Sequence, residues 1–207
     1  MPESAMGQTP IIGVLGFRLA LHEVVLFNML PFNLINKIFN MNILFNIEEK
    51  MIRVNKYLYE NKCIKAKRLL EDILEEEPDC GVAHFEMGML YYHELAEYDM
   101  ALYHFDLCKR FKPGFIPVYH VTVQLLYQLN KHKTLLKYAE SCLQIEGVNK
   151  YFVYKHLAMS AETTLLFKPS IKYYKQAKLY AIHEHDITFI KNSLIRVKEK
   201  TVNKKSK

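Results

Sequence analysis

Histidine and cysteine are the residue types in this chain best suited to bind a metal or to act as acid, base or nucleophile. The 207 residues include nine histidines and four cysteines. No HExxH motif occurs, and His183 and His185 are two positions apart, on different sides of a helix, which makes them a poor chelate. No cysteine pair forms CxxC or has zinc-finger spacing. We therefore expect packing or surface roles for the histidines, buried reduced thiols for the cysteines, and no metal or other cofactor.

Other catalytic motifs are also missing from the sequence. Neither a GxxxxGK[ST] phosphate loop nor a GxSxG nucleophile elbow occurs. The acidic residues between Glu71 and Asp79 are clustered, which is typical of a solvated helix end rather than of two carboxyl groups with opposed environments. The sequence therefore predicts a protein that is not an enzyme and has no small-molecule substrate.

Small and aromatic residues recur at helical spacing between residues 87 and 113. Gly88 and Tyr91 fall on a first amphipathic segment, and Ala101 and Phe105 fall on a second, which a proline closes. The small residues allow two helix axes to approach closely. Weaker versions of the pattern occur before and after it, and the four units begin near residues 47, 81, 116 and 151, which are 34, 35 and 35 residues apart. A period in this range indicates stacked helix hairpins.

The pattern resembles the tetratricopeptide repeat through one set of landmarks: Met87, Gly88, Tyr91, Ala101, Phe105, Cys108 and Pro113. The resemblance implies an all-α fold, a right-handed α-solenoid of about four helix hairpins with a C-terminal capping helix. The turn around residues 95–97 is one residue longer than the usual spacing of that family.

The 3.6-residue periodicity sets the expected boundaries. Residues 46–185 would form the repeat array, residues 186–200 a capping helix with Asp186 as N-cap, and residues 201–207 a basic disordered tail. The array helices are expected at 47–60, 63–77, 81–94, 98–112, 116–129, 132–146, 151–165 and 169–183.

Charge is concentrated at the C-terminal end. The formal net charge is +6, and residues 188–207 carry seven basic residues and one acid, which also gives +6. The repeat body is therefore neutral, which argues against binding of nucleic acid along the array. The tail keeps a nucleic-acid-binding helical repeat open as a further alternative.

The first 45 residues leave three interpretations open. Residues 11–21 and 24–36 are apolar runs that are too short to span a bilayer. Arg18 lies within the first run, so the segment matches a secretory signal poorly. The segment could form an extra helical hairpin, act as a membrane-interface or partner-binding element, or be translated sequence upstream of a start at Met41 or Met51. The second interpretation makes the chain a membrane-associated assembly factor anchored by residues 11–40.

The resemblance also implies a binding site. First helices of such arrays line a concave groove that holds an extended peptide or a helix of a partner protein, so we expect a cytoplasmic scaffold or adaptor, or alternatively a peripheral membrane protein. A clamp for a C-terminal carboxylate is not expected, because Glu86, Pro117 and Val121 stand where it needs amide or basic residues. The candidate groove residues are Asn55, Tyr59, Phe85, Met89, Tyr92, His93, His120, Gln124, Tyr127, Gln128, Lys155 and Met159.

Overall fold

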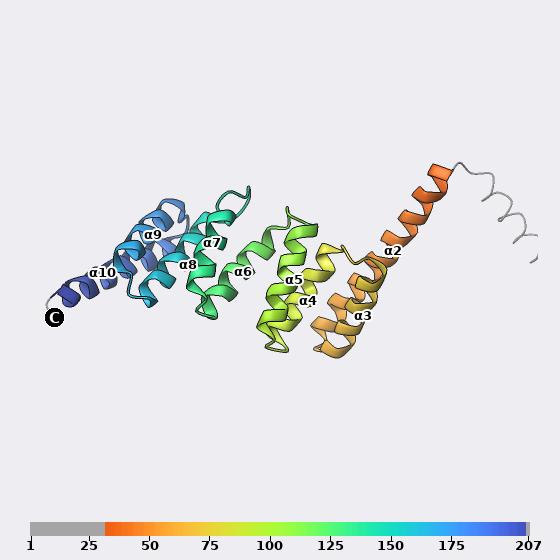
Figure 1. Ribbon diagram of the computed structural model, residues 1–207, viewed down its shortest axis with the longest axis horizontal. Coiled ribbons are helices and arrows are strands. Elements are labelled where there is room, and N and C mark those ends of the chain that lie inside the picture. The colour runs from red at the N-terminus through yellow and green to blue at the C-terminus, as the bar shows by residue number, and fades with distance from the viewer. Residues whose placement is uncertain (1–31, 206–207) are drawn as a thin grey trace, which may run out of the picture. The chain divides into compact units, whose positions relative to one another are not determined.

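The computed structural model describes the backbone of residues 32–205 and the side chains of residues 45–202, and all regular structure in this part is helical (Figure 1). The chain divides into two units, residues 1–53 and 54–207, and the boundary falls within the first described helix. The helices are α2 (Phe32–Tyr59), α3 (Cys63–Glu76), α4 (Gly81–His93), α5 (Tyr98–Phe111), α6 (Ile116–Gln128), α7 (His132–Cys142), α8 (Lys150–Thr163), α9 (Phe167–Tyr180) and α10 (Glu184–Lys205).

Helix α2 starts earlier than the sequence pattern predicts. It begins at Phe32 instead of residue 47, and residues 32–46 contain neither glycine nor proline to stop a helix. The interpretations that concern residues 1–31 lie outside the described residues. No helix in residues 32–205 is both long and apolar enough to cross a bilayer.

The C-terminal boundaries also differ from expectation. Helix α7 ends at Cys142 instead of residue 146, and a glycine with positive φ follows at Gly147. Helix α10 begins at Glu184, so Asp186 lies in its first turn and is not the N-cap. The Asp186 carboxylate instead accepts a hydrogen bond of 2.6 Å from the Tyr151 hydroxyl. Residues 201–205 continue α10 and are not a disordered tail.

The second unit contains three complete helix pairs, α4/α5, α6/α7 and α8/α9, preceded by the end of α2 and by α3 (Figure 1). The turn between the two helices of each pair, and between α2 and α3, contains a residue in the left-handed region. These residues are Asn61, Ala96, Asn130 and Leu165, with φ of 55°, 54°, 54° and 59°. They are 35, 34 and 35 residues apart, so the backbone repeats with the same period as the side-chain pattern.

A backbone hydrogen bond closes each of these turns in the manner of a Schellman motif. The amide N–H that follows the left-handed residue donates to a carbonyl five residues earlier in three of the turns, as from Lys131 to Leu126 at 3.0 Å. In the α4–α5 turn the donor is Glu97 and the acceptor is Tyr91, six residues earlier, at 2.9 Å. This turn therefore holds one extra residue, as its sequence spacing predicts.

Small residues let the paired helices approach closely. A Cβ added at Gly88 of α4 would lie 2.6 Å from the Phe105 ring of α5, so only glycine fits there. Cys108 and Cys142 are fully buried, and burial raises the pKa of each thiol to about 11. They act as small apolar core residues. Cys63 and Cys80, in contrast, are only half-buried, so the expectation of four buried thiols is wrong for these two.

Candidate functional site

The first helices of successive pairs present one line of half-buried side chains, which we call the first-helix face. Residues three or four positions apart share a side of a helix, and α6 packs directly against α8. The members of the face are Phe85, Met89 and Tyr92 of α4, His120, Gln124 and Tyr127 of α6, and Phe152, Lys155 and Met159 of α8.

The face is continuous from α4 to α6. The Tyr92 hydroxyl donates a hydrogen bond to the Gln128 side-chain oxygen across the two helices. The ring centroids of Phe85 and Phe115 are 4.9 Å apart, and the two rings meet edge to face. Phe115 is the residue just before α6. These residues therefore join two helix pairs while keeping one side open to solvent. Met89 adds an adaptable apolar surface between them.

Between α6 and α8 the face is built from aromatic and imidazole rings. The Tyr127 and His156 ring centroids are 5.5 Å apart, and those of His120 and Phe152 are 5.2 Å apart. The backbone N–H of Asn149 donates to His120 Nε2 at 3.0 Å, so this nitrogen carries no proton. Burial lowers the pKa of His120 and of His156. Both imidazoles are therefore neutral at pH 7 and hold the face together.

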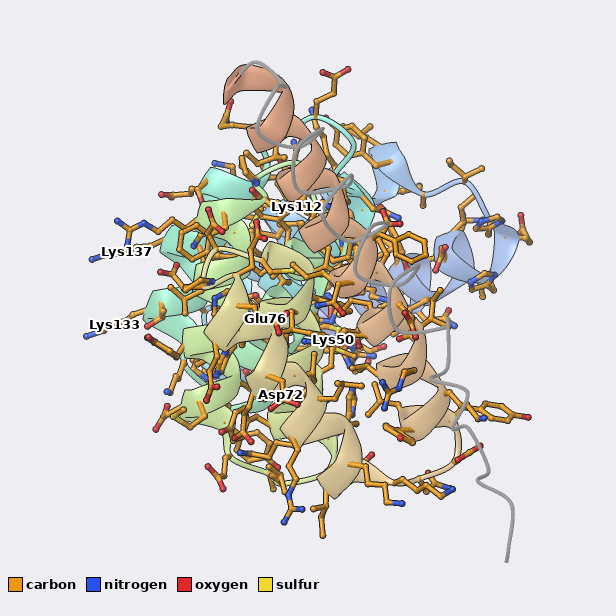
Figure 2. All side chains as sticks on the ribbon, turned by 90° about the vertical axis from the view of Figure 1, so that its right-hand side faces the viewer. Lys50, Asp72, Glu76, Lys112, Lys133 and Lys137 are labelled. Atoms are coloured by element: carbon orange, nitrogen blue, oxygen red, sulfur yellow. The ribbon has the colours of Figure 1, made fainter. Side chains whose placement is uncertain are left out.

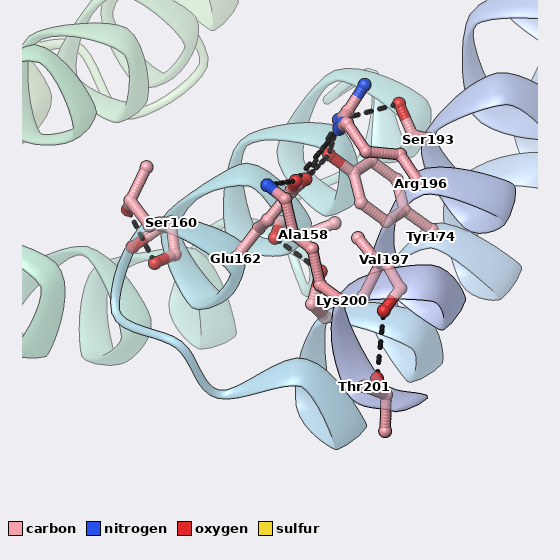
Figure 3. Close-up of polar contacts among 11 residues, drawn as sticks. Ala158, Ser160, Glu162, Tyr174, Ser193, Arg196, Val197, Lys200 and Thr201 are labelled. Carbon is pink, nitrogen blue, oxygen red and sulfur yellow. Dashed lines mark hydrogen bonds and ion pairs between the residues drawn. The ribbon is translucent and has the colours of Figure 1, made fainter. Parts of the chain in front are cut away.

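At its C-terminal end the face meets α10 through an ion-pair network (Figure 3). Glu162 of α8 is 8% exposed, and its carboxylate accepts two hydrogen bonds of 2.9 Å from Arg196 and one of 2.7 Å from Lys200. The Tyr174 hydroxyl of α9 donates to the same carboxylate at 3.0 Å. The Arg196 guanidinium, more than any other group, lowers the pKa of Glu162 to about 2. One carboxylate thus faces two cations.

A cavity of about 270 Å³ opens beside this network. Its apolar wall comes from the first-helix face and from α10, and its polar wall is the network itself. Lys155 approaches the same place, with its ammonium 5.8 Å from the centre of the Phe189 ring. The lining residues are Tyr127, Met159, Glu162, Thr163, Tyr174, Phe189, Arg196 and Lys200.

The N-terminal part of the face carries the opposite charge. Glu86 of α4 is half-buried next to Phe85, and burial raises the pKa of its carboxyl group. The face therefore has an acidic group on α4 and an excess of positive charge at α8 and α10.

A pair of buried histidines lies between α4 and α5, separate from the first-helix face. His84 Nε2 is 2.9 Å from the Pro78 carbonyl oxygen, which can only accept, so Nε2–H donates. Neutral His84 must then accept at Nδ1, and His104 Nδ1–H donates to it over 3.1 Å. Burial lowers the pKa of His84, and it lowers that of His104 to about 4. Across the described part of the chain, no three His, Cys, Asp or Glu residues are grouped to bind a metal.

Most of the sequence-predicted groove residues line this face, and four do not share its half-buried environment. Asn55, Tyr59, His93 and Gln128 are exposed, Tyr59 to 91%. His93 only stacks beside Tyr92, with ring centroids 4.2 Å apart.

Sequence reasoning missed Phe152 of the face and four residues next to it, His156, Phe189, Arg196 and Lys200. Phe152 and His156 were detectable, since they are three residues before Lys155 and Met159, respectively, and so share their side of α8. Phe189, Arg196 and Lys200 had no such signal, because α10 falls outside the repeat pattern.

Away from this face, Lys133 and Lys137 of α7 point outward into solvent (Figure 2).

Comparison with known proteins identifies the fold. No family model matches the sequence, and no curated protein matches it. Solved structures do match, among them Pseudomonas aeruginosa pilF, with a TM-score of 0.61 at 13% identity over 78% of this chain and 72% of that chain. The chain has the tetratricopeptide-repeat fold.

Two further structures share this architecture. MamA from Desulfovibrio magneticus RS-1 matches with a TM-score of 0.56 at 14% identity, over 74% of this chain and 93% of that chain. PilW, a type IV pilus biogenesis factor, matches with a TM-score of 0.53 at 16% identity, over 74% and 78%. At these identities the likeness concerns the fold, an all-α solenoid of helix hairpins, and the tetratricopeptide array here provides the first-helix face as its candidate site.

Proposed function

We propose that this tetratricopeptide-repeat protein is a non-catalytic scaffold that holds an extended segment of a partner protein on its first-helix face. The observation that carries the proposal is the composition of that face, which is made of aromatic, methionine and amide side chains at three successive first helices. Tyrosine and methionine supply large contact area, and amides supply adaptable hydrogen bonds. Solenoids commonly use such an extended surface for binding.

The chemistry of the face supports binding over catalysis. Burial keeps His120 and His156 neutral, and Glu162 is neutralised by Arg196 and Lys200. None of these groups is poised to exchange a proton near pH 7. The pairing of Arg196 and Lys200 with Glu162 also weakens the case for nucleic-acid binding, since it reduces the positive charge of α10 that phosphates would meet. The four free cysteines favour a reducing compartment, in which we place the protein.

A peptide selection tests the proposal directly. The full chain is immobilised and offered a phage-displayed library of random peptides about 12 residues long, and the selected peptides are then measured in solution by fluorescence anisotropy. We expect Tyr92→Ala and Tyr127→Ala each to weaken binding by about 10-fold or more, as for aromatic residues at the centre of an interface.

The control is an aromatic residue on the other side of the same helix pair. Tyr103 of α5 is 57% exposed and lies outside the first-helix face, so Tyr103→Ala should leave the affinity unchanged. A selection that returns no binders, or binders that are insensitive to both Tyr92→Ala and Tyr127→Ala, would contradict the scaffold proposal.

A further inference from the structure

The network at the end of the first-helix face has more cations than its internal acid can neutralise. Glu162 supplies one negative charge, whereas Arg196 and Lys200 supply two positive charges. Lys155 adds a third cation at the Phe189 ring. Two basic side chains on one carboxylate leave a net positive charge beside a cavity with apolar walls.

The cations also keep unused hydrogen-bond donors. Arg196 donates through Nε and Nη2, and the described hydrogen bonds do not involve Nη1 (Figure 3). Lys200 has three N–H donors, of which Glu162 accepts one. The side chains of Arg196 and Lys200 are 46% and 47% exposed, so a second acceptor can reach them from solvent.

The walls of the cavity limit what that acceptor can be. Tyr127, Met159 and Phe189 surround the cationic group with aromatic and thioether surface. A carboxylate carried on a short hydrocarbon stem matches both parts, because its oxygens accept charge-assisted hydrogen bonds while its methylene groups contact the apolar wall.

We propose that the C-terminal end of the first-helix face, where Lys155 approaches Phe189, Arg196 and Lys200 of α10, binds an aspartate or glutamate side chain of the partner protein. The inference rests on the proposed scaffold function and names the chemistry of its ligand. Helix α10 is then part of the binding surface, beyond its role in covering the end of the array. The acidic Glu86 on α4 sets the opposite preference at the other end of the bound segment.

The same peptide selection tests this proposal when the library is displayed with its C-terminus fused to the phage coat. Such peptides have no free C-terminal carboxylate, so any acid preference must come from side chains. We expect peptides selected on the full chain to be enriched in Asp and Glu at one position. Replacing that residue with Asn or Gln should weaken binding by about 5- to 30-fold.

Two variants of α10 separate a local contact from general attraction. Lys200→Gln removes one charge next to the cavity and leaves Arg196 paired with Glu162. Lys198→Gln removes the same charge from an exposed position of the same helix that does not line the cavity. Lys200→Gln should abolish most of the difference in affinity between the acidic peptide and its amide counterpart. Lys198→Gln should preserve that difference. Lys155→Gln, outside the Glu162 network, provides a second local variant.

The outcomes are distinguishable. Peptides whose binding depends on Tyr92 but shows no acid preference would overturn this inference and leave the scaffold function standing. Equal losses in Lys200→Gln and Lys198→Gln would also overturn it, because they indicate long-range attraction. A selection without binders would overturn both. Thermal unfolding of each variant shows whether a loss of binding reflects loss of folding instead.

Discussion

At the scale of single residues, the histidine pair between α4 and α5 has the most specific chemistry. His104 Nδ1–H donates to His84 Nδ1, and His84 Nε2–H donates to the Pro78 carbonyl. This chain of hydrogen bonds exists only while His84 is neutral, because a protonated imidazole has no acceptor. The two rings also stack with Tyr91 and Phe111. Protonation of His84 breaks its bond with His104, and burial disfavours the charged form of either ring.

This pair makes stability depend on pH in the weakly acidic range. The pKa of His104 is about 4 in the folded state and near 6.5 in the unfolded state. The unfolded chain therefore binds protons first, and stability is lost as the pH falls from about 6.5 towards 4. We expect this site to contribute a loss on the order of 2–3 kcal/mol, measured by urea unfolding at pH 7.5 and pH 4.5.

The matched variant is His104→Asn, whose amide can donate to His84 Nδ1 but does not titrate. The other lowered-pKa histidines, His84, His120 and His156, remain in this variant and account for the residual slope. A pH dependence of unfolding identical to that of the wild type would contradict the assignment.

At the scale of elements, the turn between paired helices is the repeated unit of the backbone. Asparagine occupies the left-handed position at Asn61 and Asn130, where its side chain tolerates positive φ. Ala96 and Leu165 hold the same conformation although their side chains favour it less. The helix pairs thus impose this geometry on the turn even where the local residue disfavours it.

We expect Leu165→Asn to raise the free energy of unfolding by about 0.5–1 kcal/mol, since it relieves the strain of a leucine at φ 59°. Leu165 is 58% exposed, so little buried apolar surface is lost. Leu95→Asn is the control, because Leu95 is also exposed in a turn but does not have positive φ. An equal effect of the two substitutions, measured by thermal unfolding, would show that polarity and not backbone strain is responsible.

At the scale of the second unit, α10 closes the array by burying both apolar and charged groups. Ile190 and Val197 are fully buried in a core cluster with Tyr174 and Ala177 of α9. Beside this cluster, Arg196 and Lys200 neutralise Glu162 of α8, which is 34 residues from Arg196 in the sequence. The last pair is therefore completed by a helix that is not itself a repeat, as expected of a capping element.

A double-mutant cycle tests how far this closure depends on charge. Arg196→Met should cost about 2–3 kcal/mol, because it leaves the nearly buried Glu162 carboxylate with only one cation. Glu162→Gln combined with Arg196→Met should recover at least half of that cost, since the buried charge is then absent. Additive effects in chemical denaturation would indicate that the two residues stabilise the fold independently.

The sequence carries the repeat clearly because the packing of each pair is local. Gly88 and Phe105, for example, are 17 positions apart and lie on the two helices of one pair. Helix starts at residues 63, 81, 98, 116 and 132 were accordingly predicted to the residue. The predicted start of α2 and the predicted extent of α10 were wrong, because neither helix is bounded by a repeat landmark.

The sequence by itself determined the all-α class, the period and the burial of Gly88, Ala101 and Cys108 between paired helices, since these follow from contacts between neighbours along the chain. It also placed the first-helix face in outline. Only the tertiary structure decided that Glu162 meets Arg196 and Lys200, and that α10 adds cations to that face. With 28 basic and 22 acidic residues in the chain, the pairing of charges depends on the rotation and stacking of the helices, which no local pattern specifies.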